Sequence, residues 1–371
     1  MKIGALTFHG SYNYGSVLQA YALQTYIGKL ASQRGISCEY EILNYRPPEQ
    51  KKMYAKPELS SVRNLVRRLM YEPYRGKLDE QGRKFETFIG QYLNITREFT
   101  DSELLPSFTE KYDVLLAGSD QIWNVRARDF TYGYLFEGCT SHKVSYAASL
   151  GPLEIDWSLY DKERYVSDLK EFERISVREE KSREQLNKIC PDLSCETHID
   201  PTLLLDARDW RALSSGMNVN DGNYILFYCL EPRAEHLKVA ESLSQKTGLP
   251  VVATKYRGKA DYFNHFMKLY DAGPCDFISL VDHAAMVLTS SFHGTAFSIL
   301  FQKPFYVLDG SIDGRIHDLL KLSGTLDNNL KLPIKEISIK PVVVCPDQVL
   351  EHERNRSRLY LTDALGLGQV L

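Results

Sequence analysis

The strongest constraint on the fold is an alternation of short apolar runs with segments of helical periodicity. Residues 2–8 form the first apolar run, and after it Val17, Ala20 and Leu23 recur at helical spacing. A second apolar run follows at 38–45, so the chain opens as strand, helix, strand. Strands joined through helices form parallel sheets with helices on both faces. The sequence therefore predicts an α/β fold.

The same rhythm occurs twice along the 371 residues, which predicts two domains. The first set contains predicted strands at 112–120 and 142–151, and a short strand within 174–182 that enters a charged helix at Arg178; the second set begins at 223–230. We expect two Rossmann-like domains that face a cleft, 1–205 and 206–345. The helical pattern of 346–371 is expected to pack back on the first domain. Pro201 favours an extended path, so 198–205 is predicted to be a linker.

The stretch 46–107 interrupts this rhythm and predicts a helical insertion in the N-terminal domain. Its first part, 46–84, contains eleven Lys or Arg residues and five Asp or Glu residues. Two interpretations remain open. The basic residues form either a solvated helical face or a flap over an anionic ligand.

Composition narrows the classes of function. A net charge of -3 argues against nucleic acid as the main partner. The seven cysteines are scattered, odd in number and without a CxxC pair, which favours reduced thiols and a cytoplasmic protein. Neither a signal peptide nor a membrane span is expected. If the chain serves an envelope pathway, we expect it to work on the cytoplasmic side.

The candidate site residues follow predicted strands, because open α/β sheets bind ligands beyond the carboxyl ends of their strands. In "TSSFHGTAF" (289–297), small and hydroxyl residues open a helix, which suits a phosphate. His293 can donate a hydrogen bond or a proton there. Arg178 offers a forked donor for a phosphate or carboxylate. The structural alternatives are a helix cap for His293 and an ion pair for Arg178.

Two further strand ends are polar. The loop "HGSYNYG" (9–15) and the segment "GSDQIWN" (118–124) combine polar groups with aromatic rings, as a sugar-binding site would. The alternative for the second is a turn in which Asp120 caps a helix and Trp123 lies in the core. Phosphate-loop, dinucleotide, nucleophile-elbow and metal-ligand motifs do not occur, which leaves a metal-free site for phosphate or sugar.

Taken together and in this order, these segments resemble the motifs of the polysaccharide pyruvyl transferase family. The segments are "FHGSYNYGSVLQAYALQ", "AGSDQIWN", "SYAASLG", "SVREEKS", "HIDPTLLL" and "TSSFHGTAFSILFQKPF". The resemblance covers Lys2 to about Leu320 and is most specific around His293. The opening "SYNYG" departs from the N-x-G-D form of other members.

The resemblance implies a GT-B-like fold and transfer of pyruvate from phosphoenolpyruvate to a sugar, with formation of a ketal and release of phosphate. It implies catalytic roles for His293 and Arg178. Around them we expect donor-binding residues Ser290, Ser291, Gly294 and Arg315, and acceptor-binding residues His9, Asn13, Tyr14, Asp120 and Gln121. Members of the family act on exopolysaccharide, cell-wall or glycan precursors. The expected acceptor is thus a sugar or a lipid-linked glycan, with peripheral contact to a membrane that carries it, and no cofactor is expected.

Two other functions stay open from the sequence. One is a GT-B-type glycosyltransferase that uses a nucleotide sugar, for which Glu231 is a candidate ribose ligand. The other is a non-catalytic glycan-binding protein. Binding of phosphoenolpyruvate, or of a nucleotide sugar, distinguishes them.

Overall fold

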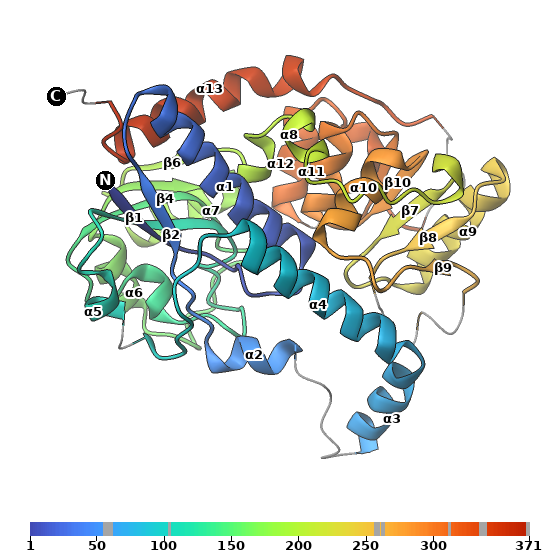
Figure 1. Cartoon of the computed structure of the whole chain (residues 1–371), viewed down its shortest axis with the longest axis horizontal. Helices are drawn as coiled ribbons and strands as arrows, with labels where there is room; N and C mark the ends of the chain where they lie inside the picture. Colours follow the sequence, from blue (N-terminus) through green and yellow to red (C-terminus); the bar gives the residue numbers. More distant parts are fainter. Residues whose placement is uncertain are drawn as a thin grey trace. The chain divides into compact units, whose positions relative to one another are not determined.

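The computed structural model describes residues 1–54, 62–102, 105–255, 260, 264–310, 313–333 and 340–368. Residues 55–61 and 103–104 of the expected insertion, and 369–371 of the expected last helix, lie outside this set. The described chain forms two compact units (Figure 1). Unit 1 comprises 1–54, 89–205 and 351–371, and unit 2 comprises 55–88 and 206–350.

Unit 1 is built on a six-stranded parallel sheet with the strand order β2-β1-β3-β4-β5-β6. The strands are β1 (Lys2–Leu6), β2 (Glu39–Ile42), β3 (Val114–Asp120), β4 (His142–Ala148), β5 (Phe172–Val177) and β6 (Cys195–Thr197). The helices are α1 (Tyr14–Gln33), α2 (Pro48–Tyr54), α5 (Leu105–Thr109), η3 (Tyr132–Leu135), α6 (Lys162–Leu169), α7 (Glu180–Ile189) and η4 (Pro201–Leu203). Every residue of β3 is buried, as expected for a central parallel strand covered on both faces.

Unit 2 contains a second six-stranded parallel sheet, with the order β12-β11-β10-β7-β8-β9. Its strands are β7 (Ile225–Tyr228), β8 (Val251–Ala253), β9 (Met267–Lys268), β10 (Met286–Thr289), β11 (Phe305–Leu308) and β12 (Asn329–Leu330). Its helices are α3 (Val62–Tyr71), η1 (Glu72–Tyr74), α8 (Ala207–Arg211), η5 (Asn220–Gly222), α9 (Ala234–Thr247), α10 (Pro274–His283), α11 (Phe292–Leu300), α12 (Gly314–Leu322) and η7 (Leu326–Asn328). Counted from β7, the order is that of dinucleotide-binding Rossmann sheets.

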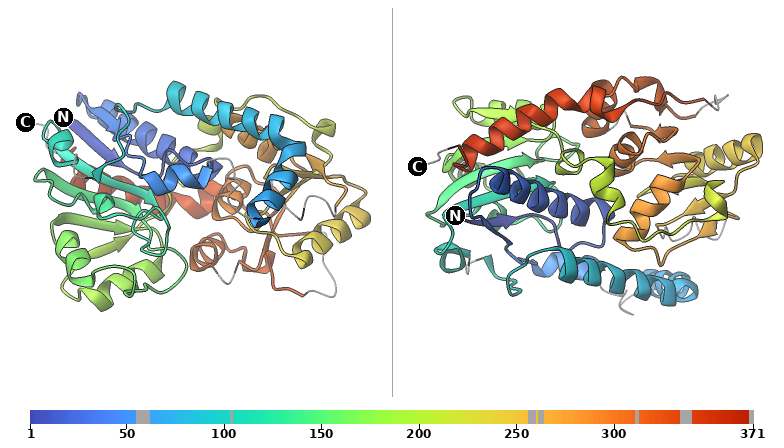
Figure 2. Two further views of the ribbon diagram at one scale, coloured as in Figure 1. Left: turned by 90° about the horizontal axis from the view of Figure 1, so that it is seen from below. Right: turned by 45° about the horizontal axis from the view of Figure 1, so that its top comes forward.

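Two long helices have residues in both units, α4 (Arg75–Tyr92) and α13 (Pro346–Ala364) (Figures 1 and 2). The sequence predicts that all of 46–107 belongs to the N-terminal domain, whereas 55–88 group with unit 2. In that unit Gln81 Nε2 donates to the Ala272 carbonyl at 3.0 Å. The Lys84 ammonium donates to Asp276 Oδ2 at 2.7 Å. At the other end of the chain, α13 contributes 351–364 to unit 1, where the Tyr360 hydroxyl donates to the Ser145 carbonyl at 2.8 Å.

The segment 198–205 is not the linker that the sequence predicts. All of its residues are buried, and it contains η4, whose N-cap is Asp200. Its burial depends on distant parts of the chain, since Arg354 Nε donates to the Leu203 carbonyl at 2.8 Å and α1 packs against η4. Among the described residues, no helix has both the length and the apolar character needed to cross a membrane.

Candidate functional site

In each unit, most of the predicted site residues lie where the strand order reverses; Arg178, which follows β5, and Arg315, which follows β11, are the exceptions. In unit 1 this switch point lies between β1 and β3, and in unit 2 between β7 and β10. Crevices form beyond the carboxyl ends of strands at such points, because the connections leave in opposite directions. The fold therefore supplies one candidate crevice in each unit, and each is described separately below.

Hydrogen bonds join the ends of neighbouring strands at the switch point of unit 1. The Thr7 hydroxyl donates to the Ser119 carbonyl at 2.9 Å, which joins the end of β1 to the end of β3. From α1, the Ser16 hydroxyl donates to Asp120 Oδ2 at 2.6 Å. Asp120 has a φ of 75°, an uncommon value for a residue other than glycine. A positive φ can mark a functional site, so Asp120 stays a candidate acceptor residue.

The other predicted acceptor residues of this edge flank Asp120 at the start of α1 and after β3. Asn13 is the N-cap of α1, with its side-chain oxygen accepting from the Gly15 N–H at 3.0 Å. Tyr14 is buried, whereas Gln121 is partly exposed and accepts from Asn124 Nδ2 at 2.9 Å. Polar side chains from β3 and α1 are thus gathered here.

Two aromatic or heteroaromatic side chains of this region are structural. Trp123 is fully buried and donates through Nε1 to the Tyr134 carbonyl at 3.1 Å, as the core alternative predicts. His9 is 1% exposed; its Nδ1 lies 3.1 Å from the Thr7 carbonyl oxygen and its Nε2 lies 2.8 Å from Asn44 Oδ1. These contacts fix the His9 ring, which positions the loop between β1 and α1.

Arg178 follows β5 and is part of a buried ionic network. Its Nη1 donates to Asp200 Oδ2 at 2.7 Å, and its Nε lies 3.6 Å from Glu179 Oε2. The three side chains are each at most 2% exposed. Both carboxylates are held from the other side by hydroxyls, Asp200 by Ser119 Oγ at 3.2 Å and Glu179 by Ser149 Oγ at 2.7 Å. The alternative of an ion pair is therefore present in the structure, although it is buried rather than at the surface.

Sequence reasoning missed Asp200 as a partner of Arg178. The signal was available, because Asp200 follows β6 in "HID" and Arg178 follows β5, and neighbouring parallel strands end at the same edge. Because 198–205 was predicted to be a linker, Asp200 was not expected to contact Arg178. A buried guanidinium needs paired carboxylates to offset its loss of hydration. Asp200 and Glu179 together meet this need.

The switch point of unit 2 is the N-terminus of α11. Ser291 is the N-cap, and its hydroxyl accepts from the Gly294 N–H at 3.4 Å. The Thr289 hydroxyl donates to the Tyr228 carbonyl at 2.6 Å and accepts from the Ser291 N–H at 3.0 Å. These bonds join β7, β10 and α11. The helix N-terminus is consequently fixed beside the strand ends, where its N–H groups and dipole favour an anion.

Gly294 permits this close approach of α11 to the strands. A Cβ atom at this position would lie 2.3 Å from Thr289 Oγ1 and 3.1 Å from Tyr228 Cδ1. A glycine at the corresponding step of dinucleotide-binding folds allows the same close packing of helix on strand. Gly294 therefore has a steric role in the packing of α11 on the strands.

His293 is the second residue of α11 and is 7% exposed. Its ring packs edge-on against Phe292, with centroids 5.2 Å apart. Arg315 lies at the start of α12, at the same edge of the sheet, and its Nε donates to Asp313 Oδ1 at 2.8 Å. Ser290 is partly exposed. Five predicted residues, Ser290, Ser291, His293, Gly294 and Arg315, therefore lie at the carboxyl edge of one sheet, while the remaining six belong to unit 1.

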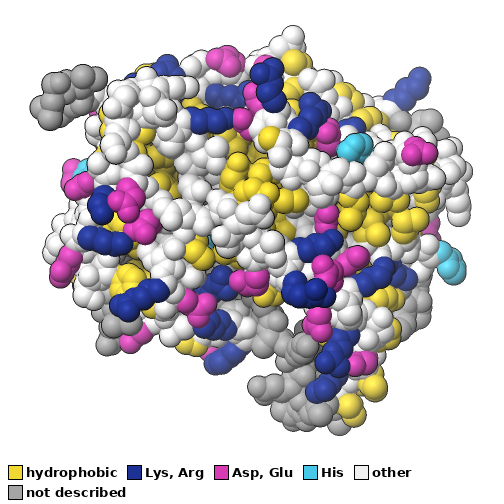
Figure 3. Space-filling model, in the orientation of Figure 1, with side chains coloured by type: hydrophobic (Ala, Val, Ile, Leu, Met, Phe, Trp, Pro, Cys, Tyr) yellow, Lys and Arg dark blue, Asp and Glu magenta, His cyan; other side chains and the backbone are white. Residues whose placement is uncertain are grey.

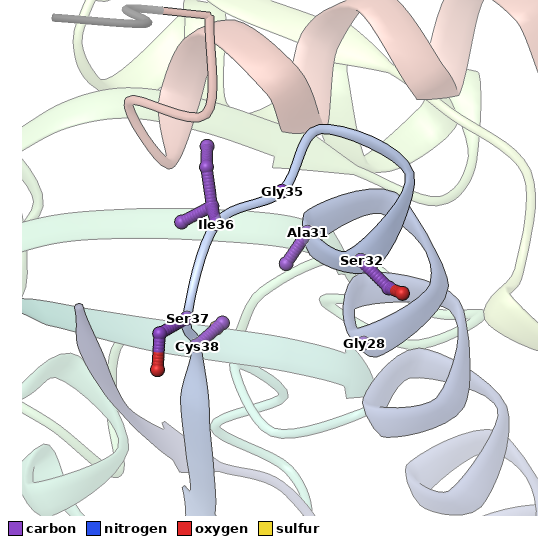
Figure 4. A pocket seen from close by; sticks show the side chains of 7 residues that line it. All are labelled: Gly28, Ala31, Ser32, Gly35, Ile36, Ser37 and Cys38. Atoms are coloured by element: carbon purple, nitrogen blue, oxygen red, sulfur yellow. The ribbon is translucent and has the colours of Figure 1, made fainter.

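Two other features of the chain help to delimit the candidate sites. The part of the chain that the structure describes contains no group of three or more His, Cys, Asp or Glu side chains arranged to hold a metal ion. A surface pocket lined by Gly28, Ala31, Ser32, Gly35, Ile36, Ser37 and Cys38 lies at the turn from α1 into β2 (Figure 4). That turn precedes β2, so the pocket lies at the amino edge of the sheet of unit 1. It is therefore separate from the candidate crevice at the carboxyl edge.

The two six-stranded parallel sheets with helices give the chain two Rossmann-like units, a fold of the GT-B type. UDP-N-acetylglucosamine 2-epimerase from Rickettsia bellii is similar at 10% identity and a TM-score of 0.50, over 100% of this chain and 99% of that one. The UDP-GlcNAc 2-epimerase from Neisseria meningitidis gives 10% identity and 0.49, over 99% and 100%. The Escherichia coli heptosyltransferase WaaC gives 14% identity and 0.39, over 85% and 90%. At such low identity the likeness concerns the fold alone.

The family is defined by sequence. The family model "Polysaccharide pyruvyl transferase" matches residues 13–311, which is most of the chain. The match begins at Asn13, the N-cap of α1, and includes the ends of β3 and β5 and the N-terminus of α11. The chain belongs to the polysaccharide pyruvyl transferase family. A search of curated proteins gives no match.

Proposed function

We propose that the chain transfers pyruvate from phosphoenolpyruvate to a sugar of a surface polysaccharide or glycan precursor. The carrying observation is the N-terminus of α11, which is fixed at the β7–β10 switch point with His293 in its first turn. Phosphoenolpyruvate carries a phosphate and a carboxylate. A helix N-terminus meets such charges with N–H donors, and no metal or further cofactor is needed in this proposal.

The reaction has a defined proton balance. Two hydroxyls of the acceptor form C–O bonds to C2 of phosphoenolpyruvate, and the bond from C2 to the phosphate oxygen breaks. One hydroxyl proton ends on C3, which becomes the methyl group, and the other leaves with the phosphate. Protonation of C3 makes C2 electrophilic. We assign His293 to this proton transfer or to assisting phosphate departure, since an imidazole can exchange protons near neutral pH.

Arg178 is proposed to hold the phosphate or carboxylate of the donor. A guanidinium has five N–H donors, so it can bridge Asp200 and an anionic ligand. The Asp200 contact at 2.7 Å fixes its orientation before the donor binds. In unit 2, Arg315, Ser290, Ser291 and Gly294 are proposed as donor-binding residues.

The acceptor is proposed to bind at the β1–β3 switch point of unit 1. Asp120 and Gln121 offer oxygen acceptors there, and Asn13 and Tyr14 begin the adjoining helix. Hydroxyl-rich ligands need such acceptors and donors in fixed positions. His9 supports this loop through its contact with Asn44.

Calorimetric titration of the full chain with phosphoenolpyruvate, and separately with UDP-sugars, tests the donor. Phosphoenolpyruvate should bind the parent protein and should bind His293→Ala more weakly. His283→Ala is the matched control, because His283 ends α10 at the amino side of β10 and its Nδ1 lies 2.9 Å from the Ser279 carbonyl oxygen. Equal weakening in both variants would assign the loss to general destabilisation.

Arg178→Ala removes the countercharge of two buried carboxylates, so Arg178→Lys accompanies it. We expect Arg178→Lys to remain folded by circular dichroism and to bind phosphoenolpyruvate more weakly, because an ammonium lacks the fork. Binding of a UDP-sugar instead of phosphoenolpyruvate would favour the glycosyltransferase alternative. Failure of both ligands to bind would favour a non-catalytic glycan-binding protein.

A further inference from the structure

Helix α3 of unit 2 presents apolar side chains to solvent. Leu65, Val66 and Leu69 are 47%, 43% and 65% exposed, and they lie within five residues. In the rest of the described chain, no stretch of this length exposes more than two large hydrophobic side chains. At 100° per residue, positions 65, 66 and 69 fall on one side of the helix. The ten-residue helix therefore carries an exposed apolar face.

The same helix is strongly basic. Its sequence, VRNLVRRLMY, has arginines at positions 63, 67 and 68 and no acidic residue. Arg68 is exposed. In Figure 3, hydrophobic and basic side chains lie together at the position of α3. An exposed apolar face on a basic helix is the pattern of helices that lie in the plane of an anionic membrane surface.

We propose that α3 docks this protein on anionic lipid bilayers, with Leu65, Val66 and Leu69 entering the headgroup boundary and the positive charge of the helix attracting anionic lipids. This proposal concerns a membrane surface and does not depend on the proposed donor. Charge complementarity favours this occupant over a second copy of the chain, whose α3 would carry the same positive charge. The area also argues against a protein partner, because stable interfaces bury about 800 Å² on each side and three half-exposed side chains offer far less.

The electrostatic and the apolar contributions to membrane binding should differ in their dependence on salt. Each arginine near an anionic surface should contribute about a fivefold gain in partitioning, or about a hundredfold for three. This part should weaken as salt rises, because exposed charges are screened. Burial of the leucines should contribute about tenfold each and should be less sensitive to salt.

Co-sedimentation of the full chain with vesicles tests the proposal, using phosphatidylcholine with and without phosphatidylglycerol. The parent protein should bind the vesicles that contain phosphatidylglycerol and should bind pure phosphatidylcholine at least tenfold more weakly. The variant R63Q/R67Q/R68Q should lose about a hundredfold of this binding. Its control is K170Q/K188Q/K246Q, which removes the same charge from three exposed lysines elsewhere and should lose less than fivefold.

The apolar part is tested by Leu69→Asn, with Leu359→Asn on α13 as the control, because the 59% exposure of Leu359 is close to the 65% of Leu69. Leu69→Asn should weaken vesicle binding about tenfold and Leu359→Asn should not. Circular dichroism checks that each variant is folded. The proposal is overturned if the parent ignores anionic vesicles, or if the two triple variants lose binding equally. It is also overturned if ultracentrifugation shows a dimer that Leu69→Asn dissociates, which would assign the face to a second copy.

Discussion

Replacing Gly294 by alanine should force α11 away from the strands beneath it. The added Cβ would lie 2.3 Å from Thr289 Oγ1 and 3.0 Å from Thr289 Cβ. Moving the Thr289 side chain away would break hydrogen bonds, because its hydroxyl donates to the Tyr228 carbonyl and accepts from the Ser291 N–H. Its β-branched side chain also has few alternative rotamers.

The expected change in the free energy of unfolding combines two destabilising contributions and one stabilising contribution. Overpacking in a buried position costs about 1–3 kcal/mol. Loss of one Thr289 hydrogen bond adds about 1 kcal/mol. The higher helix propensity of alanine offsets about 1 kcal/mol. We therefore expect Gly294→Ala to lower the free energy of unfolding by about 1–3 kcal/mol, with weaker phosphoenolpyruvate binding as α11 shifts.

Denaturant titration followed by circular dichroism measures this change, and Gly28→Ala is the matched control. Gly28 also lies within a helix, is exposed, and has open space where its Cβ would be. It should therefore gain about 0.5–1 kcal/mol from the same substitution. In Thr289→Ala/Gly294→Ala, the hydroxyl that clashes is absent, so the double variant should lose less than the sum of the single variants. A Gly294→Ala protein as stable as the parent would refute the steric argument.

Three further predictions concern buried charges. Asp200→Asn should lower the free energy of unfolding by about 3–5 kcal/mol, because it leaves the Arg178 guanidinium with less countercharge, and Arg178→Met/Asp200→Asn should lose less than the two single variants combined in denaturant titrations. Burial, together with the charges of Glu137 and Glu171, raises the pKa of Asp168 to about 6. The folded state therefore holds this proton more tightly than the unfolded state, so the free energy of unfolding falls as pH rises from about 4 to 6. Asp168→Asn should abolish that fall and be more stable than the parent at pH 7 by on the order of 1 kcal/mol, measured by denaturant titration. Burial, with a contribution from Arg356, lowers the pKa of His198 to about 4. The folded state therefore holds this proton less tightly than the unfolded state, so stability falls as pH drops from about 6.5 to 4. If the melting temperature of His198→Gln falls with pH over this range as steeply as that of the parent, this assignment is contradicted.

The predicted central strands are present, because their apolar character is a local property of the sequence. The segments at 112–120, 142–151 and 223–230, for example, contain β3, β4 and β7. The edge strands β6, β9 and β12 have only two or three residues each. Such short pairings depend on the neighbouring strand rather than on their own composition, so periodicity does not identify them.

Some features of the candidate site can be predicted from the sequence and others cannot. Residue type and position after a strand select His293, Arg178 and Asp120 as candidates, because ligands bind at strand ends in the α/β pattern. The partner of Arg178 was not identified, since Asp200 lies 22 residues further along the chain. The steric role of Gly294 was also hidden, because it depends on where Thr289 points once α11 packs.

The sequence by itself determined the α/β class, the family and the residues able to carry the chemistry, since these depend on local pattern and residue type. Only the tertiary structure decided the strand orders, the grouping of 55–88 with unit 2 and the burial of 198–205. It also decided which charges neutralise one another. These features depend on contacts between residues far apart in the chain, and the free energy of burying a charge is set by those contacts rather than by its sequence neighbours.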